Sequence, residues 1–205
     1  PVLDELVAAA GRGVEVRLVV DAKDAASSPR DANNAAIAAA GFPPEAIIRR
    51  QARVSAIAHN KFLVLLRGDT PEQVWTGSTN LTMGGIHGQS NVGHLVRDPA
   101  TAAAYSGYWD LLATDPGGHR EDPASLKRSR NAGYLAAVAT LSPVPADRGE
   151  VASGVTPVFS PRPDLGALQL YAQLIGPDAT SLVCATFAFG VAQEIQDVAA
   201  AGAPD

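Results

Sequence analysis

Two consecutive strand patterns between residues 56 and 80 constrain the fold of this chain more than any other feature. The first, Ala56 to Leu66, is apolar from Phe62 onward, and the second runs from Gln73 to Asn80. The short polar segment between them, Arg67 to Glu72, predicts a hairpin that makes the two strands neighbours. In such a pair the start of the first strand lies beside the end of the second.

Polar side chains gather at that shared end. Because side chains alternate between the two faces of a strand, His59 and Lys61 are predicted to project from one face, about 7 Å apart. Ser78 and Asn80 are expected to share a face of the second strand in the same way. An imidazole, an ammonium, a hydroxyl and an amide suit a phosphodiester, because the imidazole can attack phosphorus while the others hold its oxygens.

The order of these residues resembles the signature of the phospholipase D superfamily, His-x-Lys-x4-Asp-x6-Gly-Ser-x-Asn. The matching residues are His59, Lys61, Gly77, Ser78 and Asn80. The similarity extends over roughly residues 1–112 and 155–200. The chain is therefore identified as a member of this superfamily that covers most of a first repeat and the start of a second.

The resemblance implies a two-step displacement at phosphorus. His59 would form a phosphohistidine, which water or an alcohol then displaces. Lys61, Ser78 and Asn80 would donate hydrogen bonds to the phosphate oxygens, and Gly77 would let the backbone pass close to the phosphate. No metal or other cofactor is implied, because the histidine is itself the nucleophile.

Several positions around this signature leave alternatives open. Leu66 stands where the family has Asp, and Ser90 stands where many members carry a carboxylate. Asp69, in the longer hairpin, or Ser90 could instead orient the imidazole. Asn91 matches a substrate-binding position near the family's site, and it could equally begin a strand. Both an active phosphodiesterase and a catalytically impaired module that binds phosphate-containing ligands or acts as a scaffold fit these residues.

Alternating strand and helix patterns predict an α/β fold with a mixed sheet flanked by helices, built from a duplicated repeat. Residues 1–114 are predicted to form a first repeat without its N-terminal part, 115–150 a connector, and 151–205 the truncated start of a second repeat. The remainder of that repeat, or a second subunit, would complete the site by supplying the acid for the leaving group, so this chain by itself is expected to be nearly inactive.

The spacing of apolar residues predicts the individual elements. The predicted helices are Val2–Ala10, Asp31–Ala40, Thr101–Leu112, Ala124–Leu141, Pro163–Ile175 and Val191–Ala201. The other predicted strands are Val14–Val20, Ala46–Arg50, Val92–Val96, Val155–Ser160 and Ser181–Phe189. Residues 83–88 are predicted to form a glycine-rich loop.

Composition narrows the classes of function. The 205 residues carry a net charge of −5, which argues against a broad basic surface for nucleic acid or anionic membrane without excluding a small basic groove. No run of about 18 apolar residues predicts a transmembrane segment. Cys184 is the only cysteine, so no intrachain disulfide can form, and the compartment is left open. Phospholipid and nucleic acid both remain candidate substrates.

Overall fold

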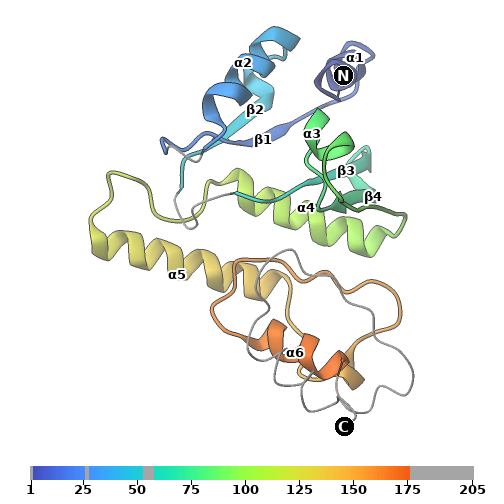
Figure 1. The fold of residues 1–205 in the computed structure, drawn as a ribbon, viewed down its shortest axis with the longest axis vertical. Helices are drawn as coiled ribbons and strands as arrows, with labels where there is room; N and C mark the ends of the chain where they lie inside the picture. The colour runs from blue at the N-terminus through green and yellow to red at the C-terminus, as the bar shows by residue number, and fades with distance from the viewer. Residues whose placement is uncertain (1, 26–27, 53–57, 176–205) are drawn as a thin grey trace. The chain divides into compact units, whose positions relative to one another are not determined.

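The structure is a computed structural model that describes residues 2–25, 28–52 and 58–175. It divides into two compact units, Pro1–Tyr134 and Leu135–Asp205. Helices alternate with strands of two small sheets, which confirms the mixed α/β class (Figure 1). The strand predicted at 181–189 and the helix predicted at 191–201 lie outside the described residues, so the duplicated repeat stays a prediction.

The first unit begins with a parallel strand pair covered by two helices. Strand β1 (Leu18–Asp21) pairs with β2 (Ile47–Arg50), with Leu18 opposite Ile47. Helix α1 (Val2–Gly11) precedes β1, and helix α2 (Arg30–Ala40) and the 3-10 turn η1 (Pro44–Ala46) connect the two strands. Apolar side chains from α1, α2 and both strands form one core: Leu3, Leu6, Val7, Leu18, Val20, Ile37, Phe42 and Ile47.

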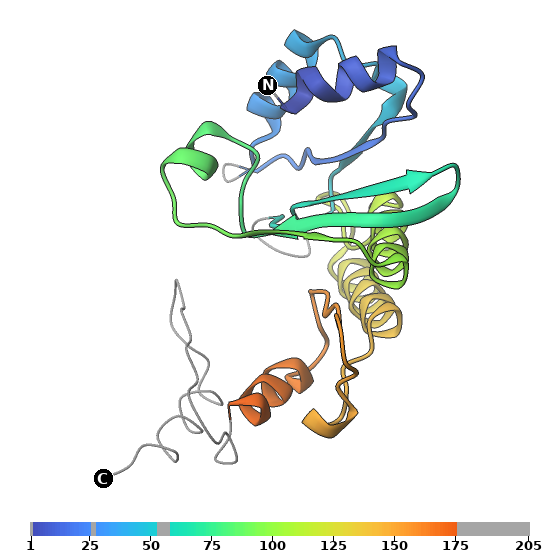
Figure 2. The same ribbon diagram turned by 90° about the vertical axis from the view of Figure 1, so that its right-hand side faces the viewer.

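Three antiparallel strands follow, in the order β3-β4-β5. They are β3 (Phe62–Arg67), β4 (Thr70–Gly77) and β5 (Gly93–Val96), and the short helix α3 (Met83–His87) links β4 to β5. Pairing of Phe62 with Thr76, and of Gly77 with Gly93, brings the start of β3, the end of β4 and the start of β5 to one end of the sheet. Figure 2 shows α3 at that end and the β3–β4 turn at the opposite end.

Helix α4 (Pro99–Ala113) covers one face of this sheet (Figure 1). Val64, Val74 and Val96 lie opposite one another in the strand register, and Val74 is completely buried. The carboxylate of Asp98 caps the helix, because it accepts a hydrogen bond from the Thr101 backbone N–H at 2.8 Å. Burial of this apolar face stabilises the unit, at about 25 cal/mol per Å² of apolar surface removed from water.

Helix α5 (Ala124–Leu141) forms where it was predicted and crosses the boundary between the two units. The second unit adds the 3-10 turn η2 (Arg148–Glu150) and helix α6 (Gly166–Leu174). The strand predicted at Val155–Ser160 is wrong. These residues form no hydrogen-bonded ladder with another strand. The Ser142 hydroxyl instead donates to Pro157 O and accepts from Phe159 N, and Pro157 has no N–H that could join a ladder.

Two further differences affect the candidate site. The second strand ends at Gly77 rather than at Asn80, and Gly77 itself has a positive φ of 155°. The predicted glycine-rich loop contains helix α3, whose N-cap Thr82 accepts a hydrogen bond from the Gly85 N–H. Among the described residues, no helix is long and apolar enough to cross a membrane.

Candidate functional site

The placement of Lys61 follows from its two neighbours. Asn60 Nδ2 donates to the Tyr108 hydroxyl at 2.9 Å, and the Phe62 ring stacks on the Tyr108 ring, so both neighbours face α4. His59 and Lys61 themselves precede β3, which begins at Phe62, so the prediction that they alternate along one strand is wrong. Lys61 Nζ donates to the backbone oxygen of His59 at 2.9 Å, which keeps the ammonium group beside that residue.

Lys61 carries a charge that is open to an anionic ligand. Its side chain is partly buried, and this burial lowers the pKa of the ammonium below its usual value. Within the described ranges, no carboxylate forms an ion pair with Lys61. A partly desolvated ammonium without a carboxylate partner interacts more strongly with an anion than a fully hydrated one does.

Gly77 and Ser78 join the end of β4 to β5. A Cβ atom on Gly77 would lie 2.1 Å from the Val92 carbonyl oxygen, so only glycine fits this close approach. The next residue completes the junction: Ser78 N donates to Val92 O at 2.9 Å, and Val92 N donates to Ser78 Oγ at 3.0 Å. The hydroxyl thus accepts a backbone hydrogen bond and keeps its own O–H for a ligand.

Asn80 lies in the loop between β4 and α3. Its backbone oxygen accepts a hydrogen bond from Thr82 N at 2.8 Å, and its side chain is exposed. A Cβ atom on Gly85 would lie 2.3 Å from Asn80 O, so α3 packs directly on this residue. The prediction that Ser78 and Asn80 alternate along one strand is wrong, because β4 ends before both.

Asn91 supports the α3 loop from the other side. Its Nδ2 group donates to Gly85 O at 3.0 Å and to Gln89 Oε1 at 3.2 Å. An amide has two N–H donors, so both are used within the protein. Asn91 therefore stabilises the α3 loop at the end of the sheet, in addition to any contact that it makes with a substrate.

The three positions considered for a group that orients the imidazole lie in two regions. Leu66 and Asp69 lie at the β3–β4 turn, whereas Ser90 lies in the loop before β5. Leu66 is half exposed and pairs with Pro71, about 13 Å along the strand from Phe62 and away from His59. Asp69 follows in the turn, so the interpretation that it orients His59 is wrong. Position 66 is therefore too far from His59 for a carboxylate there to contact the imidazole. Ser90 is exposed and forms no hydrogen bond with His59 among the described residues.

Sequence reasoning missed the residues that anchor this end of β3. The hydroxyl groups of Tyr105 and Tyr108, on α4, bind polar groups of β4 and of the segment before β3. Tyr105 OH donates to Thr76 Oγ1 at 3.2 Å, and Thr76 Oγ1 donates to Lys61 O at 3.4 Å. The available signal was Asn60, a polar residue that stands between the two candidate catalytic residues His59 and Lys61.

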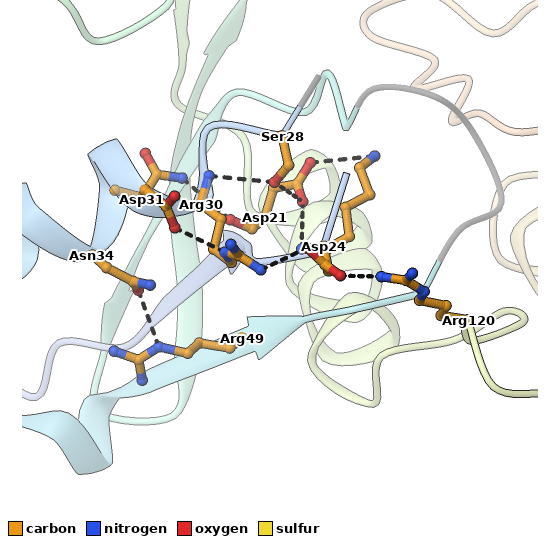
Figure 3. A network of polar contacts seen from close by, with 10 residues as sticks. Asp21, Asp24, Ser28, Arg30, Asp31, Asn34, Arg49 and Arg120 are labelled. Atoms are coloured by element: carbon orange, nitrogen blue, oxygen red, sulfur yellow. Dashed lines mark hydrogen bonds and ion pairs between the residues drawn. The ribbon is translucent and has the colours of Figure 1, made fainter. Parts of the chain in front are cut away.

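A second group of charges follows β1 (Figure 3). Lys23 Nζ lies 3.3 Å from Asp21 Oδ2, and both side chains are at least nine-tenths buried. Asp24 pairs with Arg30 and with Arg120. Lys23, Arg30 and Arg120 each have a carboxylate partner, whereas Arg49 donates to Asn34 Oδ1, so the group stabilises the loop after β1. No cluster of three or more His, Cys, Asp or Glu side chains suited to a metal occurs in the described part of the chain.

Comparison with known proteins gives one match. A family model described as "Cardiolipin synthase, PLD-like domain" matches residues 1–111. No curated protein and no solved structure matches the chain. The matched range contains the start of β3, the end of β4, β5 and nearly all of α4, and therefore the whole set of candidate residues described above.

Proposed function

Because the chain belongs to the phospholipase D superfamily, we propose that it cleaves or transfers a phosphodiester through a covalent intermediate on His59. The main support is the meeting of the His59–Lys61 segment with Gly77 and Ser78 at one end of the sheet. This end presents an exposed imidazole, a partly desolvated ammonium and a hydroxyl with a free proton. Phosphodiesterase-type activity is the general character of the family.

The reaction would proceed in two displacements. In the first, a neutral imidazole nitrogen of His59 attacks phosphorus, so a P–N bond forms while the P–O bond to the leaving alcohol breaks. In the second, the oxygen of water or an alcohol attacks phosphorus and the P–N bond breaks, while the group that protonated the leaving oxygen takes the proton of the attacking water or alcohol. Lys61 and Ser78 would stabilise negative charge on the non-bridging oxygens, and Asn80 would add a neutral donor. The leaving oxygen needs a proton from a second repeat or a second subunit.

Trapping the intermediate tests this proposal. The protein, together with the second repeat or second subunit that completes the site, would be incubated with radiolabelled phosphodiesters, quenched without acid and analysed for phosphate on His59. We expect label on the wild type and none on His59→Ala, with His87→Ala, a substitution in α3, as the matched control. Absence of label with every phosphodiester, combined with retained phosphate binding, would favour a binding or scaffolding module instead.

Apolar side chains beside the site support a phospholipid substrate. Met83 is 69% exposed and Ile86 is 56% exposed, and Leu81 and Val92 are exposed as well. Residues 73–97 contain no Asp or Glu, although the chain as a whole is acidic. Exposed apolar groups in a segment free of negative charge suit contact with a lipid surface, whereas they add little to binding of a nucleic-acid backbone.

Vesicle binding separates these two substrate classes. We expect the protein to sediment with phosphatidylglycerol vesicles, and Met83→Ser with Ile86→Ser to weaken this binding at least threefold. Leu65→Ser is the matched control, because Leu65 is also exposed but lies toward the opposite end of the sheet. Label on His59 from a DNA oligonucleotide, without vesicle binding, would assign the site to nucleic acid.

A further inference from the structure

Two tyrosines three positions apart on α4 hold the segment that carries His59 and Lys61. Tyr108 accepts a hydrogen bond from Asn60 Nδ2 at 2.9 Å. Tyr105 acts through Thr76, which donates to the backbone oxygen of Lys61 at 3.4 Å. Helix α4 therefore holds this segment at two points. Tyr108 binds the side chain of Asn60 directly, and Tyr105 is linked through Thr76 to the backbone oxygen of Lys61.

The surroundings of these hydrogen bonds are apolar and closely packed. The Phe62 ring lies 5.2 Å from the Tyr105 ring, edge to face, and 5.9 Å from the Tyr108 ring, stacked. Tyr108 is only 2% exposed, and burial raises the pKa of its hydroxyl well above the usual value. The hydroxyl therefore stays neutral at every pH at which an imidazole could act, and it always retains a lone pair for Asn60.

We propose that Asn60 and Tyr108 are positioning residues for the reaction at His59. Their hydrogen bond ties Asn60 to α4, and Asn60 stands between His59 and Lys61 in the chain, so it restrains the backbone that carries both side chains. This inference rests on the proposed function, since it assigns the geometry of that same site. A misplacement of about 1 Å can reduce the rate of a chemical step by about 10².

The test uses the protein, together with the second repeat or second subunit that completes the site, with Asn60→Ala, Tyr108→Phe and the double substitution. Tyr134→Phe is the matched control, because Tyr134 contacts the Tyr108 hydroxyl at 3.5 Å from the other side. The probe is bis(p-nitrophenyl) phosphate, with release of p-nitrophenol and the mass of the His59 adduct as readouts. We expect each single substitution to lower kcat about 10- to 100-fold with KM changed less than about threefold, and Tyr134→Phe to remain near wild type.

The double substitution shows whether the two residues act together. If they act through their shared hydrogen bond, Asn60→Ala with Tyr108→Phe should be no slower than the slower single variant. Additive losses, or wild-type kcat in Tyr108→Phe, would overturn the inference. A loss of kcat in Asn60→Ala explained by a lower melting temperature, with full activity in Tyr108→Phe, would also overturn it.

The proposed function and this inference fail in different ways. A wild-type protein that forms no adduct on His59 with any phosphodiester would remove the proposed reaction and the positioning role together. A wild-type protein that forms the adduct, while all three variants form it equally fast, would leave the reaction standing and overturn only the positioning role.

Discussion

Gly85 has no room for a side chain, whereas its neighbour Gly84 does. A Cβ atom on Gly85 would lie 2.3 Å from Asn80 O, while a Cβ on Gly84 would meet nothing within 4 Å. Substitutions at these two glycines therefore show how the packing of α3 affects one candidate site residue, Asn80. A methyl group on Gly85 must displace Asn80, whereas a methyl group on Gly84 projects into open space.

We therefore expect Gly85→Ala to weaken phosphate binding at least tenfold, because the loop that carries Asn80 must move. Gly84→Ala should bind like the wild type and should be slightly more stable, since alanine favours a helix more than glycine does. Titration with inorganic phosphate, followed by isothermal calorimetry, measures both. Equal affinity in the two variants would show that Asn80 does not contribute to binding.

At the scale of elements, α4 links the site to the rest of the first unit, and its first turn depends on one carboxylate. Hydrogen bonds from the Thr101 hydroxyl and backbone N–H lower the pKa of Asp98 below its usual value. Because the pKa in the folded state is lowered, this group stabilises the fold above the usual Asp pKa. The contribution is lost as the pH falls through the lowered value.

Asp98→Ala should accordingly lower the melting temperature by about 2–4 °C at pH 7. The difference from wild type should shrink as the pH falls through the lowered pKa of Asp98, because the protonated carboxyl is a poorer acceptor. Circular dichroism melts from pH 7 to pH 2 measure this. Asp110→Ala, at an exposed position of α4, is the control. A difference that stays constant with pH would contradict the capping role.

The sequence predicted which helices and strands form more accurately than where each of them begins and ends. The helix at Ala124–Leu141 was predicted correctly, because Pro123 and Pro143 bracket a stretch that contains no proline. The prediction extended β4 to Asn80, because the φ of Gly77 depends on a close approach to Val92, which is remote in sequence. Prolines caused the error at Val155–Ser160. The motif identified the candidate site, whereas the anchors of that site required knowledge of which face α4 covers.

At the scale of the whole first unit, one carboxylate joins segments that are far apart in the sequence. Asp115 accepts hydrogen bonds from Gln51 N at 2.9 Å and Ala52 N at 3.1 Å, just after β2. It also pairs with Arg50, and both side chains are largely buried. The carboxylate follows the end of α4, so it holds that end against the parallel strand pair.

Asp115→Ala should lower the free energy of unfolding by about 2–4 kcal/mol, because it leaves two backbone donors and a largely buried guanidinium without this partner. Asp115→Asn should lose less, since asparagine keeps an acceptor oxygen and tolerates the positive φ of 51° at this position. Urea unfolding curves measure both. Identical losses in the two variants would show that the acceptor oxygen is unimportant.

The β3–β4 turn has a consequence for experimental use of the protein. The connection from His59 to Gly77 is four residues longer than the family signature, and the irregularity in strand register falls between Leu65 and Leu66, toward the turn. Variation in chain length is thus absorbed away from the reacting groups. The turn at Gly68 and Asp69 is therefore a suitable point to insert an affinity tag or attach a fluorescent reporter.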